Sequence, residues 1–167
     1  MLLLVFTYRY FLHRFPELCI LAVPKGSNND SNSNSEPIGC VVGKIDQEDV
    51  IVNGEPQKEP TGYIGMLAVQ SAYRRRGIGK VLVEKVIHRM KDMGCQSITL
   101  ETEVSNITAQ RLYQDCFGFI REELLVRYYL NWGDAYRLRL WFDDKNTKTT
   151  TPLCQSQSEE EPTATVP

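Results

Sequence analysis

A stretch of three arginines and two glycines at residues 72–82, AYRRRGIGKVL, carries the clearest chemical signal in the sequence. Arginine binds phosphate oxygens through two parallel hydrogen bonds, and glycine lets a bound group come close to the backbone. An apolar helical pattern begins at the glycines, so unpaired N–H groups and the positive end of the helix dipole would face the same point. Because an apolar strand pattern precedes the stretch, it indicates a pyrophosphate site.

Two familiar phosphate motifs do not fit this stretch. The sequence has no G-x-x-x-x-G-K-[ST], which excludes a P-loop ATPase. It also has no G-x-G-x-x-G followed by an acidic residue about twenty positions later, which argues against a dinucleotide fold. Two simpler explanations stay open: the arginines could be a solvated face or a nuclear import signal, and the glycines could form only a tight turn.

Two glutamates and a tyrosine further along the chain could move protons. Glu101 and Glu103 are two positions apart on a predicted strand, so they share one face of it. A polar stripe at a solvent-facing strand end would look the same. Tyr113 lies in the next predicted helix, where it could instead fill the core. The two histidines, His13 and His88, lack ligand spacing and no cysteines form C-x-x-C, so we expect no metal site.

These residues must be held by alternating strands and helices, because short apolar runs alternate with segments of three-to-four spacing. The predicted elements are a helix at 5–14, strands at 18–23, 38–46 and 62–70, a helix at 78–93, a strand at 97–104, a helix at 106–118 and an antiparallel strand pair at 119–130 and 135–142. Asn106 is a predicted N-cap, and Gly94 and Gly118 are predicted C-terminal caps. The residues expected on or beside the core face of the first long helix are Ile78, Val81, Leu82, Val86, Met90 and Met93.

Three polar segments interrupt the apolar pattern. Residues 47–60 are predicted to form a polar turn. Residues 24–37 are rich in Asn and Ser and are predicted to be a flexible loop, which joins its two flanking strands into a hairpin. Residues 143–167 are predicted to be a disordered tail. The remaining elements predict one mixed α/β domain around one sheet over residues 1–142.

Charge and cysteine content restrict the class of protein. A formal net charge of −2 and a pI of about 5.7 argue against a direct nucleic-acid partner, which an extended basic face would bind. No run approaches the roughly 20 apolar residues of a membrane helix, so we expect no membrane partner. Five widely spaced cysteines, an odd number, fit a reducing compartment. We expect a cytoplasmic protein, and a nuclear location as well if the arginines are an import signal.

The segment from Arg74 to Gly79 matches in full the pattern [QR]-x-x-G-x-[GA], by which GNAT acetyltransferases bind acetyl-CoA. Four longer segments, GYIGMLAVQSAYRRRGIGKVLV, LETEVSNITAQRLY, FGFIRE and RYYLNWGDAYRLRLW, resemble the catalytic subunit of N-terminal acetyltransferase complex C. The resemblance covers roughly Thr7 to Phe142. It implies a GNAT (acyl-CoA N-acyltransferase) fold, with a mixed, mostly antiparallel sheet flanked by helices.

The reaction that the resemblance implies transfers an acetyl group from acetyl-CoA to an amine, without a metal. An N-terminal amine has a pKa of about 7.7–8.0, so much of it is protonated near pH 7 and needs a base. The resemblance makes Glu101 that base, directly or through a water molecule, and makes Tyr113 the acid that donates to the departing sulfur. A backbone N–H of Leu67 or Ala68 would stabilise the charge that develops on the acetyl oxygen.

The resemblance also implies which residues hold the co-substrate and the peptide. Residues 66–69 would diverge from the neighbouring strand and pair with the pantetheine arm, and Asn106 would bond to the same arm. The implied acetyl-CoA residues are Leu67, Ala68, Val69, Arg74, Arg75, Arg76, Gly77, Ile78, Gly79, Lys80, Asn106 and Tyr113. The implied peptide residues are Tyr63, Glu103, Tyr128 and Tyr129. For the adjacent tyrosines an ordinary strand role is the alternative, since one of the two would face the core.

The implied protein acetylates nascent chains that begin Met-Leu, Met-Ile, Met-Phe, Met-Trp or Met-Tyr, with a large auxiliary subunit and a small Sm-like subunit at the ribosome. Two alternatives stay open: a GNAT enzyme that acts on lysine or another N-terminus, and a non-catalytic protein that binds acetyl-CoA or the auxiliary subunits. In the family a strand and a first helix precede the segment that here reads TYRYF. We expect this chain to lack both and to leave one sheet edge unpaired.

Overall fold

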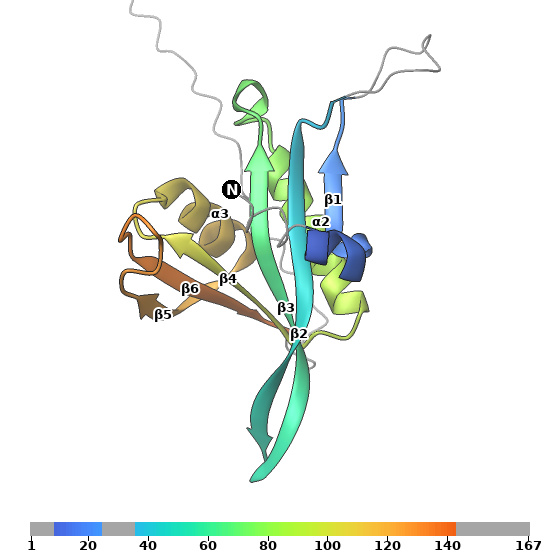
Figure 1. Ribbon diagram of the computed structural model, residues 1–167, viewed down its shortest axis with the longest axis vertical. Coiled ribbons are helices and arrows are strands. Elements are labelled where there is room, and N and C mark those ends of the chain that lie inside the picture. The colour runs from blue at the N-terminus through green and yellow to red at the C-terminus, as the bar shows by residue number, and fades with distance from the viewer. Residues whose placement is uncertain (1–8, 25–35, 143–167) are drawn as a thin grey trace, which may run out of the picture.

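One sheet of six strands forms the body of the computed structural model, which describes residues 9–24 and 36–142 (Figure 1). Residues 9–14 are helical and precede the sheet. The elements that follow are η1 (Pro16–Leu18), β1 (Cys19–Ala22), β2 (Gly39–Val52), β3 (Glu55–Val69), η2 (Ser71–Tyr73), α2 (Ile78–Asp92), β4 (Ser97–Glu103), α3 (Ile107–Phe117), β5 (Ile120–Leu125) and β6 (Ala135–Trp141). The predicted mixed α/β class is confirmed.

The strands lie in the order β1-β2-β3-β4-β6-β5, and β3 with β4 is the only parallel pair among the described strands. These two strands pair only where residues 61–63 of β3 lie beside residues 97–99 of β4. Beyond these pairs β3 stays with β2 up to Val69, while β4 continues beside β6, so the two strands diverge. The predicted mixed, mostly antiparallel sheet is confirmed, and so is its opening beside residues 66–69.

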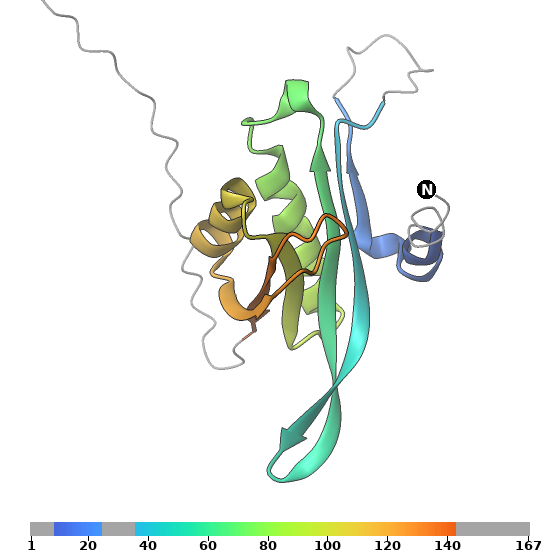
Figure 2. The same cartoon turned by 60° about the vertical axis from the view of Figure 1, so that its left-hand side comes forward.

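Helices α2 and α3 lie on one side of the sheet, and the helix at 9–14 lies on the other (Figure 2). α2 packs across β1, β2 and β3, and Met90 is fully buried in the core between them. Two glycines make room for it, since a Cβ at Gly43 or Gly62 would come within 2.5 Å of the Met90 side chain. This contact fixes α2 against β2 and β3, the second of which forms one side of the opening.

The core face of α2 is predicted only in part. Val81 and Met93, expected beside that face, are 48% and 43% exposed, whereas Val83, which was not predicted, is fully buried. Each residue of a helix is rotated by about 100° from the one before it. Val83, seven residues before Met90, therefore lies on the same side of the helix as Met90, whereas Val81, nine residues before Met90, lies on the opposite side. Gly94, with φ of 86, follows the end of the helix as predicted.

The predicted polar turn at 47–60 is wrong, because these residues form a long twisted ribbon that extends from the sheet (Figure 1). Pairing of β2 with β3 continues to the pair of Val52 and Glu55. The turn is only Asn53-Gly54, with φ of 53 and 85. Asn-Gly is typical of a two-residue hairpin turn, in which both positions take positive φ. Most ribbon side chains face water, so the segment is polar and lacks the apolar alternation of a half-buried strand.

The predicted strand at 119–130 is too long. β5 ends at Leu125, and two residues later Arg127 has φ of 53 and donates its backbone N–H to the Asp134 carboxylate at 2.8 Å. Residues 126–134 therefore form a loop between β5 and β6, which pair antiparallel as predicted. Both adjacent tyrosines of the expected peptide site lie on this loop, so neither has to face the core.

Three predictions fall wholly or partly outside the described residues. These are the start of the helix at 5–14, most of the loop at 24–37 and the tail at 143–167. The hairpin around the loop is confirmed by the antiparallel pairing of Cys19 with Val42 and of Ala22 with Gly39.

Candidate active site

The divergence of β3 from β4 opens a pocket of about 270 Å³. β3 forms one wall, β4 forms the other, and the start of α3 and the β5–β6 loop contribute the rest. The predicted site residues that line it are Leu67, Glu101, Glu103, Asn106, Tyr113 and Tyr129. The structure thus brings the predicted base and the predicted acid, from different elements, to one pocket.

Backbone alternation decides which N–H groups of β3 face this pocket. The N–H of Gln70 donates to the carbonyl of Ile38 at 2.9 Å, on the β2 side. Successive residues of an antiparallel strand point alternately to one neighbour and to the other. Ala68 therefore also faces β2, while Leu67 and Val69 face the opening. Of the two predicted oxyanion donors, the geometry favours the N–H of Leu67.

The glycines of the arginine–glycine stretch open the start of α2. Gly77 precedes the helix with φ of 77 and offers no side chain to the first N–H groups, which leaves them for an anion. A Cβ at Gly79 would meet the side chains of Leu67 and Val69 only at ordinary contact distances of 3.8 and 3.9 Å. The protein itself has room for a side chain there, so internal packing does not require the glycine.

The arginines form an exposed cationic loop between η2 and α2. Arg74 donates from Nε to a backbone carbonyl of β3 at 3.1 Å, and the Arg76 guanidinium lies 5.3 Å from the centre of the Tyr73 ring. Arg75 has φ of 62, which is uncommon for any residue but glycine. Lys80 follows in the first turn of α2. This loop does not line the pocket but lies next to it, at the end of β3.

Glu101 is held at both carboxylate oxygens. The Tyr63 hydroxyl donates to Oε2 at 2.7 Å, and Arg137 donates from Nε to Oε1 at 3.2 Å. Only 8% of the Glu101 side chain is exposed. Burial, followed by the hydrogen bond to Glu101, raises the pKa of Tyr63 above its usual value near 10. Tyr63 therefore stays protonated and keeps donating to Glu101.

Tyr113 is buried on α3, where its ring meets Phe119 edge-on at 5.5 Å. Burial raises the pKa of its hydroxyl well above the usual value, so the group holds its proton at neutral pH, as an acid must. Within the part of the chain that the structure describes, no fully buried polar side-chain atom lacks a partner. The Tyr113 hydroxyl, which bonds to no described residue, therefore reaches the pocket surface.

Asn106 begins α3 as predicted. Its Oδ1 accepts a hydrogen bond from the N–H of Ala109 at 3.1 Å, which leaves its amide nitrogen available to a ligand. Gln110 donates to the carbonyls of Glu103 and Val104 and so fixes the turn from β4 into α3. Glu103 and Glu101 lie on the same face of β4, where every second residue is half-buried, as predicted.

Tyr129 reaches the pocket from the β5–β6 loop, and Tyr128 lies beside it. Their rings contact edge to face, with centres 5.1 Å apart. Burial raises the pKa of both hydroxyls, and the charge of Glu101 adds to the shift. Three predicted peptide residues, these two and Tyr63, thus gather around the predicted base.

Arg137 is the site residue that sequence reasoning missed. It lies directly opposite Glu101 in the register of β4 with β6, and its Nη1 also donates to Glu123 at 3.0 Å. The pattern R-L-R at residues 137–139 places both arginines on one strand face, which indicates that this face carries positive charge. Only the register of β4 with β6 assigns Arg137, rather than Arg139, to Glu101.

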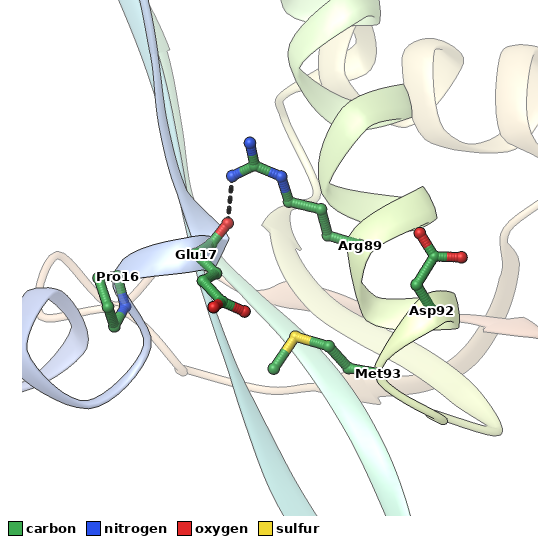
Figure 3. A pocket seen from close by; sticks show the side chains of 5 residues that line it. All are labelled: Pro16, Glu17, Arg89, Asp92 and Met93. Carbon is green, nitrogen blue, oxygen red and sulfur yellow. Dashed lines mark hydrogen bonds between the residues drawn. The ribbon is translucent and has the colours of Figure 1, made fainter.

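A second hollow, of about 590 Å³, lies between η1 and the end of α2 (Figure 3). It is lined by Pro16, Glu17, Arg89, Asp92 and Met93, and the Arg89 guanidinium donates to the backbone carbonyl of Glu17. It holds no tyrosine and no carboxylate paired for proton transfer. A hollow of about 300 Å³ on the other side of Glu101 is lined by Tyr63, Arg137 and Arg139. Only the pocket between β3 and β4 brings Glu101 together with Tyr113 among the described hollows, so it is the candidate active site.

Across residues 9–24 and 36–142, no three His, Cys, Asp or Glu side chains lie together as a metal site requires. No helix in the same residues has the length and apolar character needed to span a membrane.

The pocket as a whole can carry out acyl transfer. A carboxylate fixed at both oxygens can take a proton, a protonated tyrosine can give one, and a backbone N–H can stabilise a developing oxyanion. Each of the three comes from a different element, namely β4, α3 and β3. The helix start beside them can hold an anionic carrier.

Comparison with known proteins agrees with this chemistry. Residues 6–119 match the model of the acetyltransferase (GNAT) family. The chain is 44% identical to N-alpha-acetyltransferase 30 of Saccharomyces cerevisiae over 149 residues, which cover 89% of this chain and 78% of the relative. It is 43% identical to N-alpha-acetyltransferase 30 of Xenopus laevis over 137 residues, which cover 82% of this chain but 44% of the relative. The chain thus spans less than half the length of that relative.

A solved structure is similar over most of the chain as well. A chain in the crystal structure of the NatC complex bound to Gag peptide and CoA is 45% identical, with a TM-score of 0.70. The match covers 83% of this chain and 80% of that chain.

Proposed function

This chain belongs to the acetyltransferase (GNAT) family, and from that premise we propose that it transfers acetyl from acetyl-CoA to the α-amine of protein N-termini. The observation that carries the proposal is the pocket between β3 and β4, which Glu101, held at both oxygens, shares with the protonated Tyr113. The similarity to N-alpha-acetyltransferase 30 and to a chain of the NatC complex supports an α-amine as the acceptor.

The described residues fit acetyl-CoA, which supplies the acetyl group when bound. The outward N–H groups of Leu67 and Val69 offer a strand edge with which the pantetheine arm can pair. The amide nitrogen of Asn106 adds a donor beside it. The cationic loop and the open helix start at Gly79 suit the pyrophosphate, because both offer donors and positive charge without a side chain in the way.

The chain's own residues then divide the proton chemistry. Glu101 takes the proton of the attacking amine, which has a pKa near 8 and is partly protonated at neutral pH. Tyr113, kept protonated by burial, donates to the departing thiolate, whose pKa is near 8.5. The N–H of Leu67 stabilises the negative charge on the acetyl oxygen during the transfer.

For the peptide we propose N-termini that begin with Met followed by Leu, Ile, Phe, Trp or Tyr. Tyr63, Tyr128 and Tyr129 surround Glu101 with aromatic surface and hydroxyl groups, which suit a large apolar side chain and a peptide backbone. The similarity to a chain of the NatC complex supports work within an assembly, and we propose a large auxiliary and a small Sm-like subunit as partners at cytoplasmic ribosomes.

A peptide assay tests the proposed function. The chain, alone and co-expressed with candidate auxiliary subunits, is given acetyl-CoA and peptides that begin Met-Leu, Met-Asp and Ser-Glu, and an N-blocked peptide that contains lysine. We expect acetylation of the Met-Leu peptide alone, lost in Glu101→Gln. Acetylation of the blocked peptide would instead identify a lysine acetyltransferase. Acetyl-CoA binding without turnover in both settings would identify a non-catalytic protein.

A further inference from the structure

Two arginines of β6, Arg137 and Arg139, lie two positions apart on one sheet face, and each bridges two carboxylates. Arg137 joins Glu101 of β4, at 3.2 Å, to Glu123 of β5, at 3.0 Å. Its guanidinium offers donors in a fixed planar fork, so the position of one carboxylate fixes the group that faces the other.

A bulge in β5 makes this arrangement possible. The pairing with β6 shifts between Arg121 and Glu123, so Glu122 is an extra residue in β5. Consecutive residues of a regular strand point to opposite faces, and a bulge re-aims one of them. Here Glu122 meets Arg139 at 2.7 Å and Glu123 meets Arg137 at 3.0 Å, on the same face.

The outer and inner partners of Arg137 differ in burial. The Glu123 side chain is 53% exposed, whereas that of Glu101 is 8% exposed. The hydrogen bond from Tyr63 to Oε2 alone would leave the Glu101 carboxylate free to turn about its last carbon–carbon bond. The second hydrogen bond, from Arg137 to Oε1, defines the plane of the carboxylate and thus the direction of its remaining lone pairs.

We propose that Arg137 is a positioning residue: anchored by Glu123, it holds the Glu101 carboxylate in the orientation that takes the proton of the acceptor amine. The inference rests on the proposed function, in which Glu101 is the base. A misplacement of reacting groups by about 1 Å can lower the rate by about 10²-fold. A Glu101 carboxylate without a fixed orientation should therefore lower kcat.

Arg139 provides a matched control on the same strand face. It binds Glu48 through two hydrogen bonds, at 2.8 and 3.0 Å, and also binds Glu122 and Ser97, but it does not contact Glu101. It ties the base of the ribbon to the sheet. Replacing Arg139 therefore removes a comparable ion-pair cluster without touching the carboxylate in the pocket.

The experiment compares Arg137→Gln, Arg137→Lys and Arg139→Gln by kcat and by KM for acetyl-CoA and for a Met-Leu peptide. We expect Arg137→Gln to lower kcat by about 10- to 100-fold with an unchanged KM for acetyl-CoA. Arg137→Lys should recover part of the loss, because it keeps the charge but not the fork. Arg139→Gln should lower the melting temperature and leave kcat within about twofold. Arg139 shares a neighbouring hollow with Glu101 but makes no bond to it, and it does not line the pocket that Glu101 shares with Tyr113. An unchanged kcat in Arg137→Gln, or an equal loss in Arg139→Gln, would overturn the proposal.

Crystal structures of the two glutamine variants give a readout that does not need turnover. We expect the Glu101 carboxylate to leave the Tyr63 hydroxyl, or to adopt several orientations, in Arg137→Gln alone. An unmoved Glu101 in Arg137→Gln would contradict the positioning role whatever the kinetics show. If the wild-type protein acetylates no amine, the proposed function fails by itself, and these two structures still decide whether Arg137 orients Glu101.

Discussion

The candidate site, which comprises the pocket and the residues next to it, has two halves that differ in the groups they use. The half beside β3 and the start of α2 uses backbone: the outward N–H groups of Leu67 and Val69 and the side-chain-free approach at Gly79. The half beside β4 and β6 uses side chains, with Glu101 held between Tyr63 and Arg137. A backbone site recognises a carrier by shape and charge, whereas a side-chain site moves protons.

This difference predicts that turnover and acetyl-CoA binding can be impaired separately by substitutions. Changes in the side-chain half should lower turnover while the protein still binds acetyl-CoA. Changes in the backbone half should weaken acetyl-CoA binding while the proton-transfer groups stay in place.

The largest effect is expected from Glu101→Gln. The amide keeps the shape and can still accept from Tyr63, but it cannot take a proton, so kcat should fall by about 10²- to 10⁴-fold. Steady-state rates with a Met-Leu peptide measure this. Turnover within tenfold of the wild type would remove Glu101 from the role of base.

Tyr113→Phe comes next, with an expected loss of about 10²-fold in kcat and little change in melting temperature, because the ring still packs on Phe119. Since burial raises the pKa of Tyr113 above its ordinary value near 10, its hydroxyl stays protonated through alkaline pH. The wild-type kcat should therefore not fall between about pH 8 and 10 through loss of this proton. A rate–pH profile with such a fall, absent in Tyr113→Phe, would show that Tyr113 titrates in this range and contradict the raised pKa. An unchanged kcat in Tyr113→Phe would remove Tyr113 from the role of acid.

Gly79→Ala probes the backbone half. Its Cβ has room within the protein, and alanine favours a helix over glycine, so the free energy of unfolding should rise by about 0.5–1 kcal/mol. The same methyl group would obstruct a pyrophosphate, and the KM for acetyl-CoA should rise by about tenfold or more, which corresponds to about 1.4 kcal/mol. Chemical denaturation and steady-state kinetics measure the two effects. A stabilised variant with an unchanged KM would show that no ligand approaches Gly79.

The smallest effect concerns pH and lies outside both halves. The hydrogen bond from Arg139 lowers the pKa of Glu48 in the folded protein, so the stability it adds is present above the unfolded pKa of about 4.3 and is lost as pH falls through the folded value. Thermal melts from about pH 6 to pH 3 should show a steeper loss for the wild type than for Arg139→Gln. Equal slopes would show that the pair adds no pH-dependent stability.

The strand, the helix starts and the caps that form the backbone half can be predicted from the sequence because they are local. Gly77, Gly79 and the arginines are contiguous with the strand and the helix that they join, and Asn106 caps its own helix. Each works through neighbours within a few residues, which periodicity and capping rules describe.

The side-chain half is harder to predict because it depends on register. Arg137 reaches Glu101 only because β6 lies beside β4 with these residues opposite, and Glu123 reaches Arg137 only through a bulge. Polar strand segments, such as the ribbon that turns at Asn53-Gly54, lack apolar alternation and look like loops. Resemblance to a family supplied Glu101, but nothing local could supply its partner.

One calorimetric titration tests the separation of the two halves most directly: acetyl-CoA into the wild type, Glu101→Gln and Gly79→Ala. We expect the same Kd for the wild type and Glu101→Gln, and a Kd raised by about tenfold or more for Gly79→Ala. If Glu101→Gln loses acetyl-CoA binding while Gly79→Ala keeps it, the two halves do not divide the work in this way.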